Sequence, residues 1–309
     1  MTTEEEVRSL GRELSNWGRW GAEDELGTLN FITPEAVRRA AATVRRGVRI
    51  SLALPLDENG PARPGGIRSN PRHEMTAAGD GSTEMGPMGL GAGYTDDVLH
   101  LYLQCASQWD SLAHIHYDGF LYNGFPACSV TQSGATHNSI TASASHFVGR
   151  GVLLDVARHR GVPWLDPGEG IGGAELDAVA EAQAVELLSG DIVLVRTGLM
   201  RSWHENGDWK TFWRPQPGIQ LDVARWLYGH EVAAVAADNT AVEQMGRTFD
   251  VPLHMVALRD MGLCFGELWD LEELAEDCAA DGVYEMLLSA QGLRVTGGVG
   301  SPVNPVAMK

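Results

Sequence analysis

The sequence predicts an α/β fold with a mixed central sheet. Three observations support this. Strand-like segments alternate with helix-like segments through the second half of the chain, the strand-like segments are short apolar runs such as Gly190–Thr197, and the helix-like segments carry apolar residues on overlapping faces. No internal repeat is visible, and no convincing domain boundary follows residue 98. We therefore expect one domain over residues 1–309, with residues 1–97 as an N-terminal extension and long loop.

The N-terminal part of the chain predicts one helix and one long loop. Thr33 is a candidate N-cap, Pro34 suits the first helical position, and Glu35–Arg46 continues the helix. Residues 56–97 are rich in glycine, proline and polar side chains, and they show no clear periodicity. Because long irregular segments in compact domains are usually functional, we expect a functional loop or a lid there.

The remaining elements follow from apolar periodicity and from turn residues. The first of them is a strand that leads directly into a group of polar residues. We expect strands over Val98–Leu103, Gly151–Val156, Gly190–Thr197, Val232–Ala236 and Tyr284–Ser289, and helices over Ala174–Leu188, Leu221–His230 and Glu272–Ala280.

Composition disfavours several classes of function. The formal net charge of −18 argues against nucleic-acid binding, and the absence of a run of 18 apolar residues argues against a membrane helix. The N-terminus lacks the basic start and apolar core of a signal peptide, so we expect a cytoplasmic protein. The four cysteines form no CxxC pair, and we expect them to be small buried apolar residues.

A first group of candidate site residues lies between residues 104 and 114. Gln104, Gln108, Asp110 and His114 all occupy even positions, so an extended chain would place them on one face. Asp and His are metal ligands, and Gln offers a weaker neutral oxygen. A buried, hydrogen-bonded Asp–His pair explains the same residues equally well.

The neighbours of this group leave two interpretations open. Trp109, Tyr117, Phe120 and Tyr122 would form apolar walls for a ring-bearing substrate, or they would pack in the core. For His116, a solvated or supporting role is favoured over a role as a metal ligand, because a metal site needs only a few ligands.

A second group lies far downstream. His254 and Glu267 are isolated polar residues in apolar surroundings, and buried ionisable groups are costly unless they are paired or bind a metal. Ion pairs with the intervening Arg259 and Asp260 are the alternative explanation. Asp238 ends a predicted strand, where polar residues often line the clefts of α/β proteins.

The segment Gln104–His114 resembles the signature of the cyclase family, usually written HxGTHxDxPxH. Asp110 and His114 agree with this pattern, while two glutamines replace histidines and a leucine replaces the proline. Other segments resemble further landmarks of the family in the expected order: GVLLDVARHRG, GDIVLVRTG, VAAVAADN, PLHMVALRDMG with the later Glu267, and VGSPVNPVA. The resemblance spans roughly residues 15–309.

This family includes proteins similar to kynurenine formamidase and isatin hydrolase, which are metal-dependent amide hydrolases. The resemblance implies a swivelling β/β/α cyclase-like fold with a mixed central sheet. It implies that Asp110, His254 and Glu267 bind a divalent metal ion, zinc or manganese, and that His114 is the catalytic acid or base. Because amide oxygens are poorer ligands than imidazole, the two glutamines imply one metal per chain. Family members commonly form homodimers or homotetramers.

We therefore predict a metal-dependent hydrolase of carbon–nitrogen bonds, similar to an arylformamidase, that acts on an amide or lactone of a small molecule. Two alternatives stay open: a lyase, dehydratase or cyclase acting on a small carbonyl compound, and a member that binds a ligand without turnover. The sequence does not name the substrate. Asp110 and His114 would be catalytic, and the substrate would contact Gln104, Gln108, Trp109, Tyr117 and Tyr122.

Overall fold

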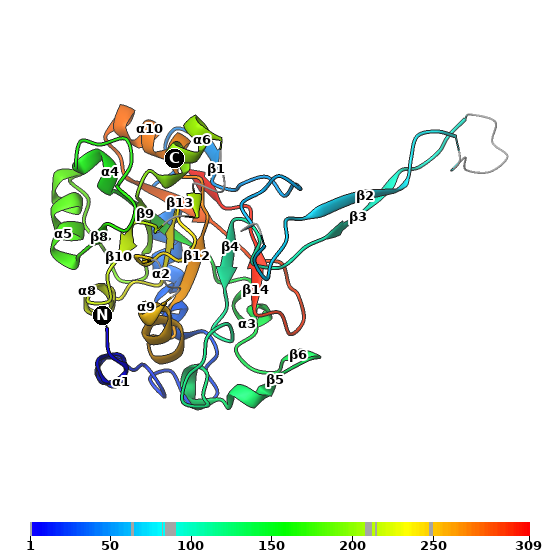
Figure 1. Cartoon of the computed structure of the whole chain (residues 1–309). Coiled ribbons are helices and arrows are strands. Elements are labelled where there is room, and N and C mark those ends of the chain that lie inside the picture. The colour runs from blue at the N-terminus through cyan, green and yellow to red at the C-terminus, as the bar shows by residue number, and fades with distance from the viewer. Residues whose placement is uncertain are drawn as a thin grey trace.

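A mixed, curled sheet forms the centre of the molecule (Figure 1). The computed structural model describes residues 2–62, 65–81, 83, 91–207, 212–213, 215–246 and 250–309. Within these residues the sheet has nine strands in the order β1-β15-β13-β7-β9-β11-β12-β4-β14. Their bounds are β1 Arg49–Ser51, β4 Gln108–Asp110, β7 Val148–Asp155, β9 Ile192–Arg196, β11 Ala234–Ala237, β12 Cys264–Glu267, β13 Glu285–Ser289, β14 Gly300–Pro302 and β15 Val306–Met308.

Parallel pairing is confined to the middle of this sheet. Strands β7, β9, β11 and β12 run parallel, and the strands on either side of them pair in antiparallel fashion. The predicted mixed sheet is therefore confirmed. The short strands β4 and β14 continue the sheet beyond β12.

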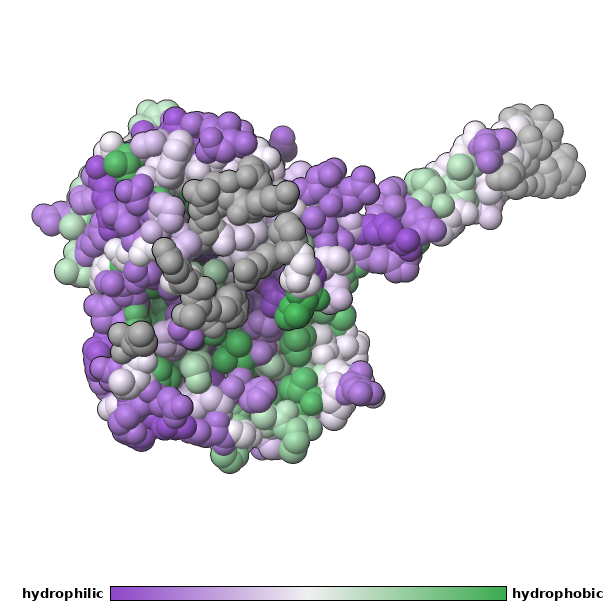
Figure 2. Space-filling view, viewed as in Figure 1, coloured by the Kyte–Doolittle hydropathy of each residue, from purple (hydrophilic) through white to green (hydrophobic). Residues whose placement is uncertain are grey.

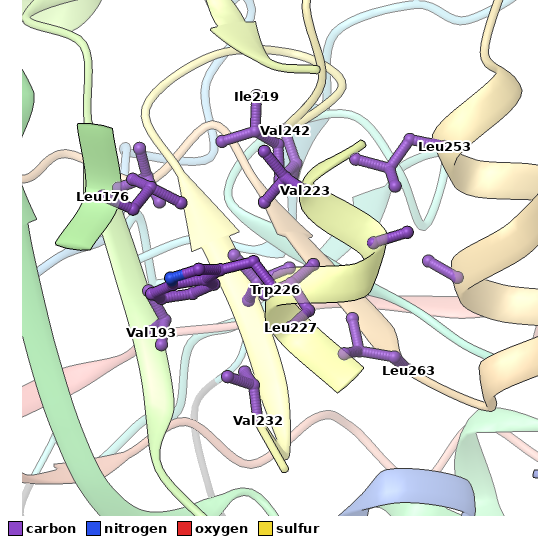
Figure 3. Close-up of a cluster of buried hydrophobic side chains, with 14 of the residues drawn as sticks. Leu176, Val193, Ile219, Val223, Trp226, Leu227, Val232, Val242, Leu253 and Leu263 are labelled. Carbon is purple, nitrogen blue, oxygen red and sulfur yellow. The ribbon is translucent and has the colours of Figure 1, made fainter. Parts of the chain in front are cut away.

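The middle strands are buried on both faces. Along β9, Val193 and Val195 point into one apolar cluster, which we call the first face, and Ile192 and Leu194 point into a second cluster, the second face. Helices α1 (Glu4–Glu13), α5 (Gly173–Ala182) and α8 (Val223–Gly229) pack on the first face, and α10 (Glu272–Asp281) packs on the second. Figure 3 shows side chains of the first face, with Val223, Trp226 and Leu227 of α8 beside Leu253 and Leu263.

Shorter elements connect these layers. The helices are α2 Pro34–Ala41, α3 Ile140–Ser143, α4 Val156–His159, α6 Leu199–Asn206 and α9 Pro252–His254, the π-helix η4 is Met255–Met261, and the 3-10 turns are η1 Gly27–Phe31, η2 Tyr122–Gly124 and η3 Ala127–Ser129. Two small strand pairs join β5 (Val130–Thr131) to β6 (Gly134–Ala135) and β8 (Gly170–Ile171) to β10 (Gly218–Ile219). In the part of the chain that the structure describes, no helix is long and apolar enough to cross a membrane.

A two-stranded arm projects from the body (Figure 1). It consists of β2 (Arg72–Ala77) and β3 (Asp96–His100), which form a two-stranded antiparallel sheet. Figure 2 shows that the arm is largely hydrophilic where it leaves the body. The expectation of an irregular loop over residues 56–97 is thus wrong for β2, and the strand predicted at Val98–Leu103 overlaps β3 of this exposed arm. Because both faces of the arm are exposed, β2 carries no apolar alternation from which it could be predicted.

Most other predicted elements exist but are shorter than expected. Thr33 caps α2 as predicted, with its side chain accepting a hydrogen bond from the backbone N of Ala36 at 3.2 Å, but the helix ends at Ala41 instead of Arg46. Helix α5 ends at Ala182, because Ala184 adopts a φ of 51° and a right-handed helix requires a negative φ. The N-terminal residues are also part of the body, since β1 pairs with β15 and α1 packs in the first face.

Candidate metal centre

Three buried side chains from separate segments meet on the first face of the sheet. Asp110 ends β4, Glu267 ends β12, and His254 lies at the junction of α9 and the π-helix. Strands β4 and β12 pair so that Gln108 is opposite Glu267. Because side chains alternate along a strand, Gln108 and Asp110 lie on one face of β4. Glu267 and Phe265 of β12 lie on the same face of the sheet. The pairing of β4 with β12 therefore brings the carboxylates of Asp110 and Glu267 close together.

The geometry of these three residues suits a metal ion. One ligand atom from each of Asp110, His254 and Glu267 lies within 4.8 Å of the other two. His254 Nε2 is 3.2 Å from Glu267 Oε1 and 3.9 Å from Asp110 Oδ2. The three side chains are at most 6% exposed, so their ligand atoms are shielded from solvent.

Asp110 carries the clearest sign that a cation belongs here. Both of its carboxylate oxygens are buried, and neither has a hydrogen-bond partner among the described residues. Burial and the neighbouring Asp110 carboxylate raise the pKa of Glu267 above its ordinary value. Two adjacent buried carboxylates are costly without a counter-charge, and a carboxylate–carboxylate–imidazole set is suited to a divalent metal. The residues present therefore fit the metal that the sequence resemblance implies.

Glu243 holds His254 in the orientation that a metal ligand needs. Its Oε1 accepts a hydrogen bond from His254 Nδ1 at 2.5 Å, and its two oxygens also accept from the backbone N–H groups of Leu253 and His254. Nδ1 therefore carries a proton, and Nε2 faces Asp110 and Glu267, where it would lose its own proton on binding a metal. Burial lowers the pKa of His254, but the hydrogen bonds with Glu243 and Glu267 outweigh this and raise it overall.

The sequence prediction did not include Glu243, because its neighbours give little signal. Only Ala241 and Val242 separate it from the polar residues Asp238–Thr240, and Gln244 follows it, although the structure buries it. Val242 has a φ of 58°, which a β-branched residue rarely adopts, and Leu268 next to Glu267 has a φ of 59°. Backbone strain of this kind clusters at functional sites, and here it adjoins two of the residues that form the centre.

His114 lies at the more accessible edge of the centre. Its Nε2 is 3.8 Å from Asp110 Oδ1, and its side chain is 20% exposed. Burial is the largest influence on its pKa and lowers it from the ordinary value, while Asp110 opposes the shift. His114 is therefore neutral at pH 7 and able to accept a proton.

Gln108 and Gln104 occupy different positions relative to the centre. Gln108 donates a hydrogen bond from Nε2 to Glu267 Oε2 at 2.7 Å, and its buried Oε1 has no partner among the described residues. The side chain of Gln104 packs against Gly300, so closely that a Cβ added to Gly300 would lie 2.4 Å from Gln104 Nε2. Gly300 pairs with Asp110 across β14 and β4. Of the four even-numbered residues, only Gln108 and Asp110 therefore share an extended segment, because the chain turns on both sides of β4.

The three aromatic residues predicted to contact substrate lie in different surroundings. Trp109 is fully buried in the second face, stacks on Phe147 with ring centroids 4.5 Å apart, and lies on the opposite side of β4 from Asp110. Tyr122 is also fully buried there, with its hydroxyl donating to Asp24. These surroundings correct the expectation that the two rings form pocket walls and agree with the core-packing alternative.

Tyr117 and Glu243 line a cavity of about 940 Å³ next to helix α1. Glu243 contacts the Nδ1 side of His254, whereas Nε2 faces the other two ligand residues. This cavity therefore adjoins the centre behind the histidine ring. The Tyr117 hydroxyl donates to Asp260 at 2.5 Å, so this tyrosine is held by a polar contact within the protein.

Other residues considered from the sequence lie away from the centre. His116 is exposed, and Arg259 pairs with Asp260 instead of with Glu267, so the ion pairs expected as an alternative for His254 and Glu267 do not form. Asp238 is fully buried and accepts hydrogen bonds from the backbone N–H groups of Thr197 and Gly198, so it joins the ends of β9 and β11 and lines no cleft. Three cysteines are buried as expected, but Cys128 is exposed.

The fold and the centre together define an α/β protein with a curled mixed sheet that carries a buried candidate metal site. A family model described as "Putative cyclase" matches residues 50–244, and the chain belongs to this cyclase family. A solved structure described as a novel cyclase is 41% identical to the chain, covers 96% of it and 100% of its own length, and superposes with a TM-score of 0.90. The family predicted from the sequence is confirmed.

More distant structures share the fold. Isatin hydrolase A from Labrenzia aggregata, bound to benzyl benzoate, is 16% identical, with a TM-score of 0.63 over 87% of this chain and 95% of that one. A predicted metal-dependent hydrolase from Bacillus stearothermophilus is 14% identical, with a TM-score of 0.54 over 85% of this chain and 98% of that one. No curated protein matches the chain.

Proposed function

We propose that the protein is a metal-dependent hydrolase that cleaves an amide or lactone of a small molecule. One observation carries the proposal: both oxygens of the buried Asp110 carboxylate are unpaired among the described residues, beside His254 and Glu267. The fold is shared with isatin hydrolases and with a predicted metal-dependent hydrolase, which supports hydrolysis as the reaction class. In this proposal Asp110, His254 and Glu267 hold one divalent ion, zinc or manganese.

A divalent ion in such a site lowers the pKa of a water molecule and polarises a carbonyl group. The protein residues would do the rest of the chemistry. Glu243 keeps His254 in the required tautomer, and Gln108 fixes the orientation of Glu267. His114, neutral and partly exposed, would accept a proton as the nucleophile attacks and donate it to the leaving group.

The first experiment combines metal content with product mass. The protein as purified is analysed for zinc and manganese and is incubated with isatin-like lactams, aryl formamides and simple lactones. We expect about one metal per chain. A cyclic lactam or lactone should give one product heavier by one water, and an aryl formamide should give an amine and formate whose masses together equal that of the substrate plus one water. Products whose summed mass equals that of the substrate, or is lower by one water, would favour a cyclase, lyase or dehydratase, and unchanged turnover after complete chelation of metal would contradict the proposal.

Two variants sharpen this test. Asp110→Asn removes a ligand charge, so we expect it to lose both metal and activity. Asp238→Asn is the matched control, because it alters an equally buried aspartate whose carboxylate is hydrogen-bonded to Thr197 and Gly198 and not to the candidate ligands. Equal metal content in Asp110→Asn and the control would rule out Asp110 as a ligand.

A further inference from the structure

Arg68 lies beside the candidate metal centre without an acidic partner. It belongs to the segment between β1 and β2 and is half-buried. Its Nη1 donates a hydrogen bond to the backbone O of Gln104 at 3.1 Å. Among the residues that the structure describes, no carboxylate lies within ion-pair distance of its guanidinium, and only Gln104 accepts a hydrogen bond from it.

Two observations place this guanidinium close to the reacting groups. The Gln104 side chain packs against Gly300, which pairs with Asp110 in the sheet. Arg68 also acts electrostatically on His114 and on Glu267, lowering the pKa of each. It therefore lies near the centre, beside Gln104.

The segment that carries Arg68 is held by specific contacts. Asn70 accepts a hydrogen bond from the backbone N of Ala62 and donates to the backbone oxygens of Glu58 and Gly60. Trp213 donates from Nε1 to the backbone O of Pro61. These contacts limit the conformational entropy lost when Arg68 binds a ligand.

Building on the proposed hydrolase function, we propose that Arg68 binds a carboxylate group of the substrate, so that the substrate is an amide or lactone carrying one carboxylic acid. The guanidinium of Arg68 has no acidic partner among the described residues, and its remaining N–H groups form a fork that matches a carboxylate. A dianionic phosphate fits less well, because Asp110, Glu243 and Glu267 make the surroundings acidic.

The test measures binding of benzoate and of its neutral counterpart benzamide by titration calorimetry. The proteins are the wild type as purified, Arg68→Gln, Arg68→Lys and the control Arg72→Gln. Arg72 is close in sequence and 70% exposed on the arm, so its replacement changes the net charge equally without touching the centre. Thermal unfolding of each variant verifies that it is folded.

We expect Arg68→Gln to weaken benzoate binding by about tenfold or more, since a charged hydrogen bond is lost, while benzamide binding is unchanged. Arg68→Lys should retain part of the affinity, and Arg72→Gln all of it. Equal benzoate affinity in the wild type and Arg68→Gln, or no binding of benzoate to the wild type, would overturn the proposal. Repeating the titration after chelation separates the two proposals. If benzoate binding still depends on Arg68 in a protein that shows no metal-dependent hydrolysis, carboxylate binding by Arg68 stands and only the proposed function is contradicted.

Discussion

Glu243 accepts a hydrogen bond from His254 Nδ1 at 2.5 Å, and this contact determines which ring nitrogen faces the two carboxylates of the centre. The same carboxylate binds the backbone N–H groups of Leu253 and His254, so it fixes both the ring and the turn that carries it. Glu243 is therefore a positioning residue for the candidate metal ligand.

Glu243→Gln should weaken metal binding by about 10- to 100-fold, because a neutral amide supports the imidazole less strongly than a carboxylate. Competition of the protein with a chromogenic chelator measures this affinity. Glu285→Gln is the control, since Glu285 also pairs with a buried charge, Arg150, but lies far from the centre. Equal metal affinities in the two variants would remove Glu243 from the metal site.

His114→Gln should retain the metal and lower kcat by about 10²- to 10⁴-fold, the usual contribution of a general acid or base. Burial holds the pKa of His114 below 6.5, so wild-type kcat/KM should stay constant from pH 7 down to that region and fall only at lower pH, as the imidazole gains a proton. The residual activity of the variant should lack this acidic limb. A limb that persists unchanged would assign the titration to another group.

Gln108→Glu would place a carboxylate where an amide now donates to Glu267 at 2.7 Å. The additional buried charge should destabilise the metal-free protein by about 3 kcal/mol, and a bound cation should offset much of that loss. Thermal unfolding with and without chelator should therefore show a larger metal-dependent rise in Tm for Gln108→Glu than for the wild type. The same rise in both proteins would show that Gln108 does not adjoin the metal.

Asp238 provides a stability test away from the centre. Burial raises its pKa to about 6 from 3.8, although Thr197 opposes the shift. The folded protein therefore binds a proton more tightly than the unfolded chain does, and stability is lost as pH rises through this interval, by about 3 kcal/mol at most.

Urea unfolding of the wild type and of Asp238→Asn at pH 7 and pH 5 isolates this contribution. The variant lacks the ionisable group, so the wild type should gain stability relative to Asp238→Asn on going from pH 7 to pH 5. A stability difference that does not change with pH would contradict the raised pKa.

The sequence predicted those elements whose pattern is local. Apolar runs located β7, β9, β11 and β13, and apolar faces located α5, α8 and α10, because these segments bury their own side chains. Strand β4 could not be located from its three residues, since it exists through pairing with β12 and β14. Strand β2 of the arm was missed for the opposite reason, because it buries little and shows no apolar pattern.

Prediction of the centre depended on buried charge and on alternation. His254 and Glu267 were recognisable as polar residues in apolar surroundings, and the structure brings them to Asp110. The alternation of side chains that places Gln108 and Asp110 on one face of β4 places Trp109 on the opposite face. The same alternation therefore excludes Trp109 from the pocket to which it was assigned. Arg68 gave no local signal, because its position depends on a long segment that folds back to Gln104.

The most direct test of the central claim is anomalous diffraction from crystals of the protein soaked in zinc or manganese, collected at the absorption edge of that metal. The account predicts one strong peak bounded by Asp110, His254 Nε2 and Glu267, with Glu243 on the far side of the histidine ring. Fully occupied metal at other residues, or no peak between these three side chains, would contradict it.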